Sequence, residues 1–285
     1  GLNPALLSWS EGATPRLLHA HAHQKEQFTD PLVKGLKTSL HGVTETGAGS
    51  NLYDMKTNAV RKGSDWVLNG TKAYITNYFD ADVAQVLAIT NPGGGRKSFT
   101  YFMFDTKEYA AKGYKIGKLY QTMFGDGYTG EIHFDEMVLP DSAVLGEVNG
   151  GWMVTMTLLG NQLGAGAAIN AIGFRAELDK LIELAREKGV TDDAVMRQRL
   201  AVAYTKVEVM RFLGYSALTA FLNGKKPGPD ASIGKLFWAE YHKEVTELAV
   251  DILGADALTP SGKPALTYLR SDAVGSPNSS ARWVD

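Results

Sequence analysis

The sequence predicts an α+β fold in three parts: a helical N-terminal remnant, a middle antiparallel β domain and a C-terminal helical bundle. Residues 39–146 alternate short runs rich in Val, Ile, Phe, Tyr and Thr with turn residues, a pattern typical of an antiparallel sheet or barrel. From residue 149, apolar side chains recur with helical spacing. Strands and helices do not alternate strictly, which argues against a parallel doubly wound sheet. We place the domains at 1–38, 39–146 and 147–285, and expect the last to be incomplete.

Composition limits the classes of function. The 285 residues are 44% hydrophobic and 21% charged, which is ordinary for a globular chain with a buried core. The net charge of −2 gives no overall attraction to nucleic acid or anionic membranes. No run approaches the roughly 18 apolar residues of a membrane span. Cysteine is absent, which excludes disulfides, thiolate catalysis and cysteine-ligated metals and fits a reducing cytoplasm. We therefore expect no nucleic-acid partner, no membrane span and a cytoplasmic location.

Both ends of the sequence are abrupt. Gly1 starts the chain without a methionine or a signal peptide, and Asp285 follows Ala-Arg-Trp-Val without a terminating signal. We expect that the chain belongs to a longer protein whose two ends are absent here.

The first part, residues 1–38, combines leucine pairs with three prolines and predicts helix and turns. It also contains His19, His21 and His23. On a helix, residues two apart point to different faces, so these histidines would not converge. We expect solvated or partly buried histidines and no metal site.

Five apolar runs predict the strands of the middle domain, at residues 66–68, 84–90, 99–104, 114–116 and 130–134. Asn69-Gly70 is a strong turn signal. It predicts a hairpin that joins the first of these runs to Tyr74-Ile75.

Three long stretches predict the bundle helices, at residues 151–186, 192–223 and 232–253. Thr191 is the expected N-cap of the second helix, and Gly254 ends the third. Residues 276–284 are expected to begin a fourth.

The stretch 42–51 reads Gly-Val-Thr-Glu-Thr-Gly-Ala-Gly-Ser-Asn. Its small residues at 47–49 let the backbone approach a flat or anionic ligand closely. Hydroxyls that both donate and accept hydrogen bonds surround them, on Thr44, Thr46 and Ser50. An ordinary glycine-rich turn also explains this stretch, which is neither a dinucleotide fingerprint nor a phosphate-binding P-loop.

The stretch 68–77 reads Leu-Asn-Gly-Thr-Lys-Ala-Tyr-Ile-Thr-Asn. Tyr74 and Thr76 are two residues apart, so on a strand their side chains share one face. Such a face offers a stacking ring and a hydroxyl to the same ligand. An ordinary strand face is the alternative interpretation.

The order and separation of the two stretches resemble those of the acyl-CoA dehydrogenase family. The resemblance continues through residues 130–140, Leu145-Gly146 and Gly150-Gly-Trp152, which look like the last strand of the middle domain and the start of the bundle. It implies the family's fold, bound FAD and an acyl-CoA substrate. It also implies an electron-transfer flavoprotein as partner, and a homodimer, a homotetramer or a heteromer.

The resemblance assigns roles within the first stretch. Val43 and Thr44 correspond to residues that meet the pyrimidine edge of the flavin. Gly49 and Ser50 correspond to positions near the pyrophosphate and the acyl thioester carrier, so Ser50 is expected to contact both cofactor and substrate.

The second stretch and the bundle supply the remaining cofactor contacts. Tyr74 stands where an aromatic residue flanks the flavin ring, Ile75 follows it, and Thr76 supplies the hydroxyl expected near flavin N5 and O4. Gln198 resembles a glutamine that reaches FAD from a neighbouring subunit.

The sequence departs from the family at residues 189–193, where a longer insert with Arg-Thr-Phe-Gly is missing, and at two sets of expected contacts. Asp251-Ile-Leu-Gly254-Ala occupies the position of Gln-x-x-Gly-Gly, and an acidic residue near a pyrophosphate is unfavourable. Asn161 and Gln162, the expected substrate contacts on the first bundle helix, stand where some members carry a Glu-Arg pair. The catalytic glutamate of other members would follow Asp285, so the catalytic base is unknown.

Three functions are consistent with these observations. The first is α,β-dehydrogenation of an acyl-CoA thioester in fatty acid metabolism, with FAD as cofactor. The second is a non-catalytic or structural subunit of a heteromeric acyl-CoA dehydrogenase. The third is a flavin oxidase or monooxygenase with the same fold.

Overall fold

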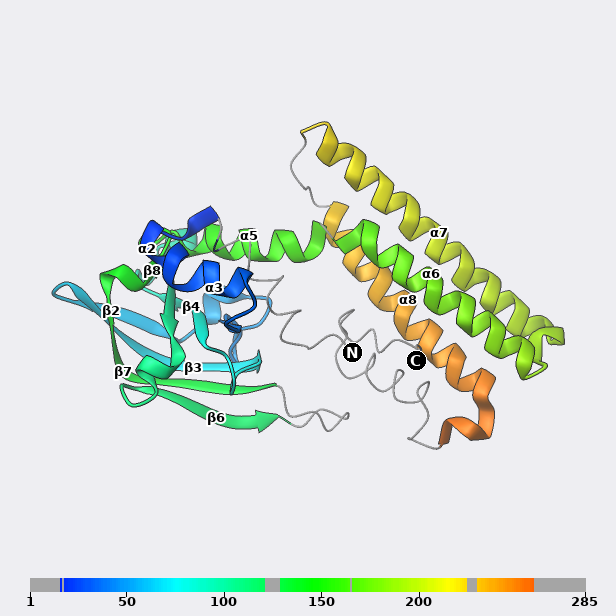
Figure 1. Ribbon diagram of the computed structural model, residues 1–285, viewed down its shortest axis with the longest axis horizontal. Helices are drawn as coiled ribbons and strands as arrows, with labels where there is room; N and C mark the ends of the chain where they lie inside the picture. Colours follow the sequence, from blue (N-terminus) through cyan, green and yellow to red (C-terminus); the bar gives the residue numbers. More distant parts are fainter. Residues whose placement is uncertain (1–15, 17, 121–128, 165, 225–229, 259–285) are drawn as a thin grey trace. The chain divides into compact units, whose positions relative to one another are not determined.

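The computed structural model describes residues 16, 18–120, 129–164, 166–224 and 230–258. It has the α+β architecture that the sequence predicts, with a β sheet followed by long helices (Figure 1). The described residues up to Leu159 form one compact unit, and those from Gly160 form another. The second unit thus begins inside helix α5 (Gly151–Gly164), and the domain boundaries at 38 and 146 stay a prediction.

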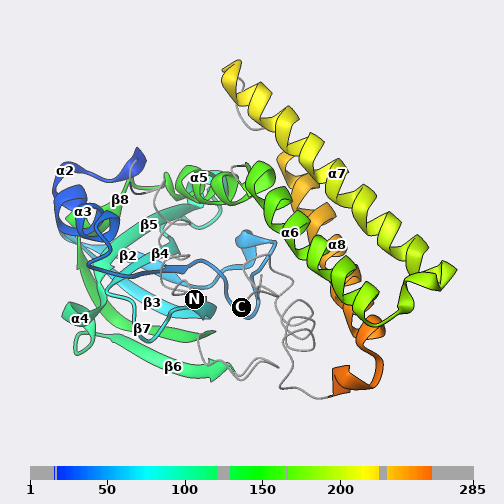
Figure 2. The ribbon, with the colours of Figure 1, turned by 45° about the vertical axis from the view of Figure 1, so that its right-hand side comes forward.

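One sheet holds eight strands within the described residues. They are β1 (Ser39–Gly42), β2 (Asn58–Lys62), β3 (Asp65–Thr76), β4 (Val83–Ile89), β5 (Phe99–Asp105), β6 (Tyr114–Tyr120), β7 (Thr129–Pro140) and β8 (Val144–Leu145). Their order is β6-β7-β3-β2-β4-β5-β8, and β1 pairs with β4 (Figure 2). The pairs are antiparallel except β1–β4 and β2–β4, which are parallel.

The two faces of this sheet pack against different hydrophobic clusters. Along β5, Phe102 and Phe104 belong to one cluster, whereas Tyr101 and Met103 belong to the other. This alternation follows from the two-residue period of a strand. Short helices flank the strands: α2 (Ala22–Gln24), a π-turn (Lys25–Thr29), α3 (Asp30–Val33) and α4 (Thr106–Tyr109), with 3₁₀ turns at Leu52–Asp54, Gly95–Ser98 and Asp141–Ala143.

The predicted hairpin at Asn69-Gly70 is wrong. Residues 65–76 form the single strand β3, and the reversal lies at Gly63 and Ser64, between β2 and β3. Gly70 instead marks an irregularity where the pairing of β3 with β7 shifts register. Its φ is +144°, and a Cβ there would come within 2.5 Å of Thr57. Glycine is needed here for a bulge, which shares its sequence signal with a turn.

The histidine run is anchored to the rest of the unit. His21 Nε2 and His23 Nε2 lie 2.9 and 3.0 Å from the carbonyl oxygens of Gly146 and Ser142. Their rings stack with centroids 6.0 Å apart. The expectation of solvated or partly buried histidines is confirmed, because His21 and His23 are exposed and His19 is partly buried. The argument from helical spacing does not apply to His21, which is the extended N-cap of α2 and lies outside the helix. The described residues contain no group of three or more side chains arranged to hold a metal.

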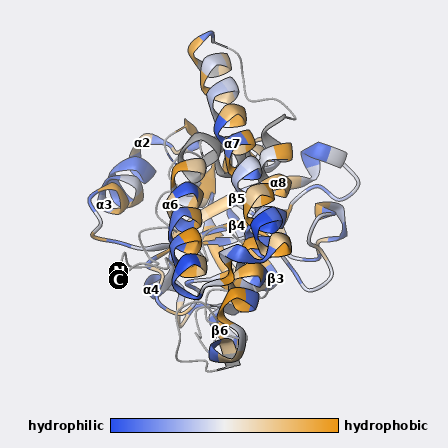
Figure 3. Cartoon of the chain, turned by 90° about the vertical axis from the view of Figure 1, so that its right-hand side faces the viewer, coloured by the Kyte–Doolittle hydropathy of each residue, from blue (hydrophilic) through white to orange (hydrophobic). Residues whose placement is uncertain are grey.

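The described residues of the second unit form three long helices that lie alongside one another in Figures 1 and 2. They are α6 (Gly166–Glu187), α7 (Ala194–Leu222) and α8 (Asp230–Leu253), with 3₁₀ turns at Val190–Asp192 and Gly254–Leu258. Hydrophobic and hydrophilic residues are mixed along each helix (Figure 3). The apolar side chains that face inward, including Phe174, Leu178, Val207 and Tyr241, form one core.

Three helix predictions need correction or fall outside the description. The helix expected over 151–186 is described as α5 and α6, with residue 165 not described. Asp193 caps α7 in place of Thr191, because its carboxylate accepts hydrogen bonds from the amides of Val195 and Met196. The helix expected at 276–284 lies outside the described residues. Gly254 ends α8 as predicted, with φ at +58°.

Candidate functional site

The stretch 42–51 leaves β1 and closes a tight turn. Glu45 and Ala48 exchange two backbone hydrogen bonds of 3.0 and 3.1 Å, which places Thr46 and Gly47 at the tip. A Cβ added at Gly47 or Gly49 would meet nothing within 4 Å. The backbone of this turn is therefore open on the side where a ligand can approach.

The end of β3 presents alternate side chains to solvent. Tyr74 and Thr76 are exposed, and Ile75 between them is buried in the sheet core. This exposure is in line with the predicted shared face of Tyr74 and Thr76, while the side chain of Ile75 points into the core. Only the backbone of Ile75 is available to a ligand on the exposed face.

Two residues at this end have left-handed backbone conformations. Tyr74 has φ at +59° and Asn77 has φ at +64°, values that cost about 1–3 kcal/mol for a non-glycine residue. Asn77 is almost fully buried, and its Nδ2 has no hydrogen-bond partner among the described residues. A buried donor without a partner beside exposed Thr76 is a feature that a polar ligand atom would satisfy.

A buried ion pair joins the two stretches. Lys72 of β3 reaches back, and its Nζ lies 2.9 Å from Glu45 Oε1 and 3.1 Å from the carbonyl oxygen of Val43. The Lys72 side chain is fully buried and that of Glu45 is 8% exposed. Gly42 makes room, because a Cβ there would come within 3.3 Å of Lys72 Cγ. The pair therefore fixes the first stretch against the strand that carries the second.

Hydrogen bonds complete this junction. Glu45 also accepts from the backbone amides of Lys56 and Thr57, at 2.8 and 3.0 Å. The backbone amide of Ala73 donates to the carbonyl of Thr44 at 2.9 Å. Each charge-bearing atom of the pair thus has partners, which is the condition under which a buried ion pair is tolerated.

Burial and pairing shift the pKa values of Lys72 and Glu45 in opposite directions. Burial lowers the pKa of Lys72 to about 8, against the opposing effect of the Glu45 carboxylate. Burial alone would raise the pKa of Glu45, but the Lys72 ammonium and the hydrogen bonds from Thr57 and Lys56 together hold it below its usual value. We conclude that Glu45 is a carboxylate at neutral pH.

The junction fits a flat ligand with polar edges, such as a flavin. The turn backbone is open at two glycines, and the exposed strand face carries the ring of Tyr74. The same two stretches also carry hydroxyls, on Thr44, Ser50 and Thr76. Val43 is half-buried against the core, and its carbonyl is already engaged by Lys72.

The remaining predicted cofactor contacts lie in the second unit. Gln198 is exposed on α7. Beside it, Arg199 Nη1 lies 2.6 Å from Asp251 Oδ2 on α8. The Arg199 guanidinium compensates the negative charge of Asp251, so the repulsion between Asp251 and a pyrophosphate would be weaker. The side chains of Asn161 and Gln162 lie outside the description.

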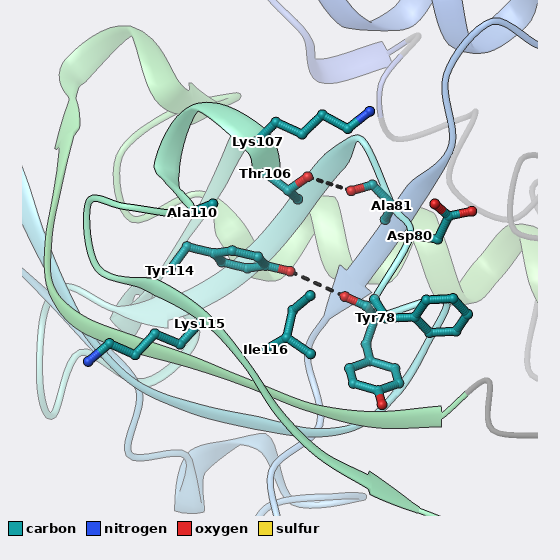
Figure 4. Close-up of a pocket in the computed structure, with 10 residues that line it drawn as sticks. Tyr78, Asp80, Ala81, Thr106, Lys107, Ala110, Tyr114, Lys115 and Ile116 are labelled. Carbon is teal, nitrogen blue, oxygen red and sulfur yellow. Dashed lines mark hydrogen bonds between the residues drawn. The ribbon is translucent and has the colours of Figure 1, made fainter.

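A hollow of about 430 Å³ is separate from these residues. Figure 4 shows it between the segment after β3, α4 and the start of β6, with the Tyr114 hydroxyl 3.5 Å from the carbonyl of Tyr78. Its two lysines are paired, Lys107 with Asp82 and Lys115 with Asp135. Their charges are therefore compensated, and none of the predicted ligand residues lines this hollow.

A second hollow, of about 410 Å³, is lined by Tyr53, Phe99 and the glycine-rich loop between β4 and β5. Tyr53 stacks on Trp152 of α5 with ring centroids 5.6 Å apart, and the Arg96 guanidinium lies 5.9 Å from the Trp152 ring centroid.

None of the described helices combines the length and apolar character needed to cross a membrane.

Sequence reasoning missed the residues that build the junction. It gave Glu45 no role and did not single out Lys72 or Asn77. Lys72 carries a weak signal, since a lysine with apolar or small neighbours on a strand is unusual when buried. Its partner lies 27 residues away, and no local pattern reveals such a pairing.

Comparison with known proteins agrees with this geometry. The profile "Acyl-CoA dehydrogenase, middle domain" matches residues 41–137, and "Acyl-CoA dehydrogenase, C-terminal domain" matches 149–274. The chain is 32% identical to the acyl-CoA dehydrogenase IpdE1 of Mycobacterium tuberculosis over 78% of its length and 57% of that protein. It is also 32% identical to the caffeyl-CoA reductase–Etf complex subunit CarC of Acetobacterium woodii, over 84% of this chain and 64% of that protein.

A solved structure shows the same likeness. Butyryl-CoA dehydrogenase from Megasphaera elsdenii superimposes with a TM-score of 0.83 at 26% identity, covering 95% of this chain and 73% of that one. The chain thus spans somewhat more than half of the length of the curated relatives it matches.

The ion pair gives a stability prediction. We expect Lys72→Met to lower the free energy of unfolding by about 3–5 kcal/mol, because it leaves the Glu45 carboxylate buried without its counter-charge. The double variant Lys72→Met/Glu45→Gln should recover more than half of that loss. Urea unfolding followed by circular dichroism measures both. A single variant that loses less than about 1 kcal/mol would show that the pair is not buried in solution.

The pH dependence of the same pair has a definite sign. The folded pKa of Glu45 lies below its usual 4.5, so its contribution is present above about pH 4.5 and is lost as the pH falls through the folded pKa. We expect the stability difference between the wild type and Glu45→Gln to narrow as the pH falls from about 4.5 through the folded pKa of Glu45. A difference that stays constant over this range would contradict the assignment.

Proposed function

The chain belongs to the acyl-CoA dehydrogenase family, and from this premise we propose that it takes part in the FAD-dependent α,β-dehydrogenation of an acyl-CoA thioester. The observation that carries the proposal is the junction of the two stretches through Glu45 and Lys72. The open glycine turn, the hydroxyls of Thr44, Ser50 and Thr76 and the exposed ring of Tyr74 lie in one unit of the chain, and these features suit a flavin.

Within this proposal, the residues of the junction hold FAD. Val43 and Thr44 meet one polar edge of the ring system, and Gly49 and Ser50 offer backbone amides and a hydroxyl to the phosphates. On β3, Tyr74 stacks beside the ring, while Thr76 and Asn77 donate hydrogen bonds to its polar atoms. When bound, FAD supplies the two-electron acceptor for the hydride that leaves the β-carbon.

The acyl-CoA substrate is supported by the family and by the names of the relatives. Ser50 follows the open turn and is exposed, which suits a contact with the thioester carrier. Asn161 and Gln162 lack a carboxylate, so neither removes the α-proton, and they are proposed only to contact the substrate. We assign no catalytic base within the chain.

The partners are proposed on separate grounds. An electron-transfer flavoprotein as the electron acceptor is supported by the Etf complex named for the Acetobacterium woodii relative. A second copy of the chain is supported by α7, where Val195, Val202, Val209 and Phe212 are exposed at helical spacing and form an apolar stripe. Light scattering that returns the mass of one chain would contradict self-association.

A second candidate function is a non-catalytic subunit of a heteromeric acyl-CoA dehydrogenase. It is favoured by Asn161 and Gln162, which replace the charged pair found in some members. This candidate shares the flavin site and differs in having no dehydrogenation of its own.

Absorption spectroscopy tests the proposal. We expect the purified protein to bind FAD, to show the two visible bands of an oxidised flavin, and to lose the longer-wavelength band when a matching acyl-CoA is added without oxygen. The same titration with free CoA serves as the control, since CoA carries no acyl group to oxidise.

The outcomes separate the candidates. A protein that does not bind FAD would contradict both functions. FAD binding without bleaching by any acyl-CoA, restored only when an unlike family member is added, would favour the non-catalytic subunit. Bleaching followed by hydrogen peroxide formation in air would instead indicate an oxidase.

A further inference from the structure

Five side chains contact one another in series on the exposed face of β3, β7 and β6. We call them the Tyr120 cluster: Thr71, Tyr74, Tyr120, Glu131 and His133. Thr71 Oγ1 and His133 Nδ1 share a hydrogen bond of 2.9 Å. His133 Nε2 lies 3.6 Å from Glu131 Oε2. The Tyr120 hydroxyl donates to Glu131 Oε1, and the Tyr120 ring stacks on Tyr74 with centroids 4.7 Å apart and an interplanar angle of 20°. The first and last residues of this series, Thr71 and Tyr74, both belong to β3.

The cluster acts on a strained residue. Tyr74 has a left-handed backbone, with φ at +59°, which is unfavourable for a non-glycine residue. Its side chain is 55% exposed, so burial does not hold the ring in place. Among the described aromatic rings, Tyr120 is the one that stacks on it. The orientation of Tyr74 therefore depends on how firmly Tyr120 is held.

Tyr120 is held by a charge-assisted hydrogen bond. Its phenol donates to the Glu131 carboxylate, and such bonds are stronger than those between neutral groups. This hydrogen bond, together with burial and the negative charge of Glu131, raises the pKa of Tyr120 to about 12. The phenol accordingly keeps its donor proton throughout the neutral range.

The backbone of β6 is adapted to the cluster. A Cβ at Gly117 would come within 2.2 Å of His133 Nε2 and 2.9 Å of Glu131 Cβ. The pairing of β6 with β7 also shifts register between Ile116 and Leu119. Glycine and the shifted register together leave room for the histidine and the carboxylate between the strands.

Two charged groups near His133, Lys115 and Asp135, are engaged with each other. Lys115 pairs directly across from His133 in the sheet, and its Nζ lies 2.8 Å from Asp135 Oδ2. Glu131 is therefore the carboxylate that faces both His133 and Tyr120, with 19% of its side chain exposed.

We propose that Glu131 and His133 are positioning residues that, through Tyr120, hold the ring of Tyr74 in the orientation from which it stacks beside the flavin. The inference rests on the proposed flavin site. It adds a second support to that site, from the strand pair β6–β7, which is independent of the Glu45–Lys72 junction.

Spectroscopy of Glu131 variants tests the proposal. In Glu131→Ala we expect the near-ultraviolet dichroism of the tyrosine pair to fall in the flavin-free protein. We also expect the visible dichroism of bound FAD to change and its dissociation constant to rise about fivefold, because the stacking ring is no longer fixed. Glu131→Gln keeps an acceptor for the Tyr120 hydroxyl and should stay within about twofold of the wild type.

Two further variants complete the test: one is a control, and the other breaks the same hydrogen bond from its other end. Asp135→Ala removes a neighbouring carboxylate of β7 that is outside the cluster, and should leave all three signals unchanged. Tyr120→Phe keeps the stacking ring and removes only the hydrogen bond. It is expected to change the flavin dichroism and the dissociation constant in the same direction as Glu131→Ala even if that variant folds poorly.

The outcomes separate this inference from the proposed function. Failure of the wild-type protein to bind FAD would overturn both together. If the wild type binds FAD but Glu131→Ala and Tyr120→Phe leave the flavin dichroism and the dissociation constant unchanged, the positioning role alone is overturned. Equal losses in Glu131→Gln and Asp135→Ala would also overturn it.

Discussion

The candidate site depends on one buried ion pair. Lys72 and Glu45 are 27 residues apart and belong to different segments, yet they meet at 2.9 Å where water hardly reaches. A buried pair of this kind adds little net stability relative to apolar residues, but breaking it is costly. Its consequence is therefore geometric. The pair and the backbone hydrogen bond from Ala73 to Thr44 hold the turn that follows β1 against β3, the strand that also carries Tyr74 and Thr76.

Conformational strain marks the same region. Tyr74 and Asn77 both adopt left-handed backbone conformations at the end of β3, and the buried Nδ2 of Asn77 has no hydrogen-bond partner among the described residues. Strain and unsatisfied groups persist only where the surrounding structure enforces them. Here the ion pair fixes one side of the strand, and the Tyr120 cluster fixes the other. The site is held from both sides before any ligand arrives, and that limits the entropy lost on binding.

Much of this arrangement was predictable from the sequence, because strands, helices and glycine turns have local signals. The shared face of Tyr74 and Thr76 followed from their spacing alone. Asn69-Gly70 was misread as a hairpin because a bulge uses the same residues as a turn. Lys72 with Glu45, and Tyr120 with Glu131 and His133, were not found, since each pairing joins segments that become neighbours only in the folded protein. The Arg199–Asp251 pair was missed for the same reason, although it changes the meaning of an unexpected aspartate.

The most direct test of this account is the affinity for FAD of Lys72→Met, measured by quenching of flavin fluorescence under conditions where circular dichroism shows the variant to be folded. We predict that the folded variant binds FAD at least about tenfold more weakly than the wild type, because the turn at 45–48 is no longer held against β3. Unchanged affinity in a folded Lys72→Met protein would contradict the claim that this ion pair builds the site.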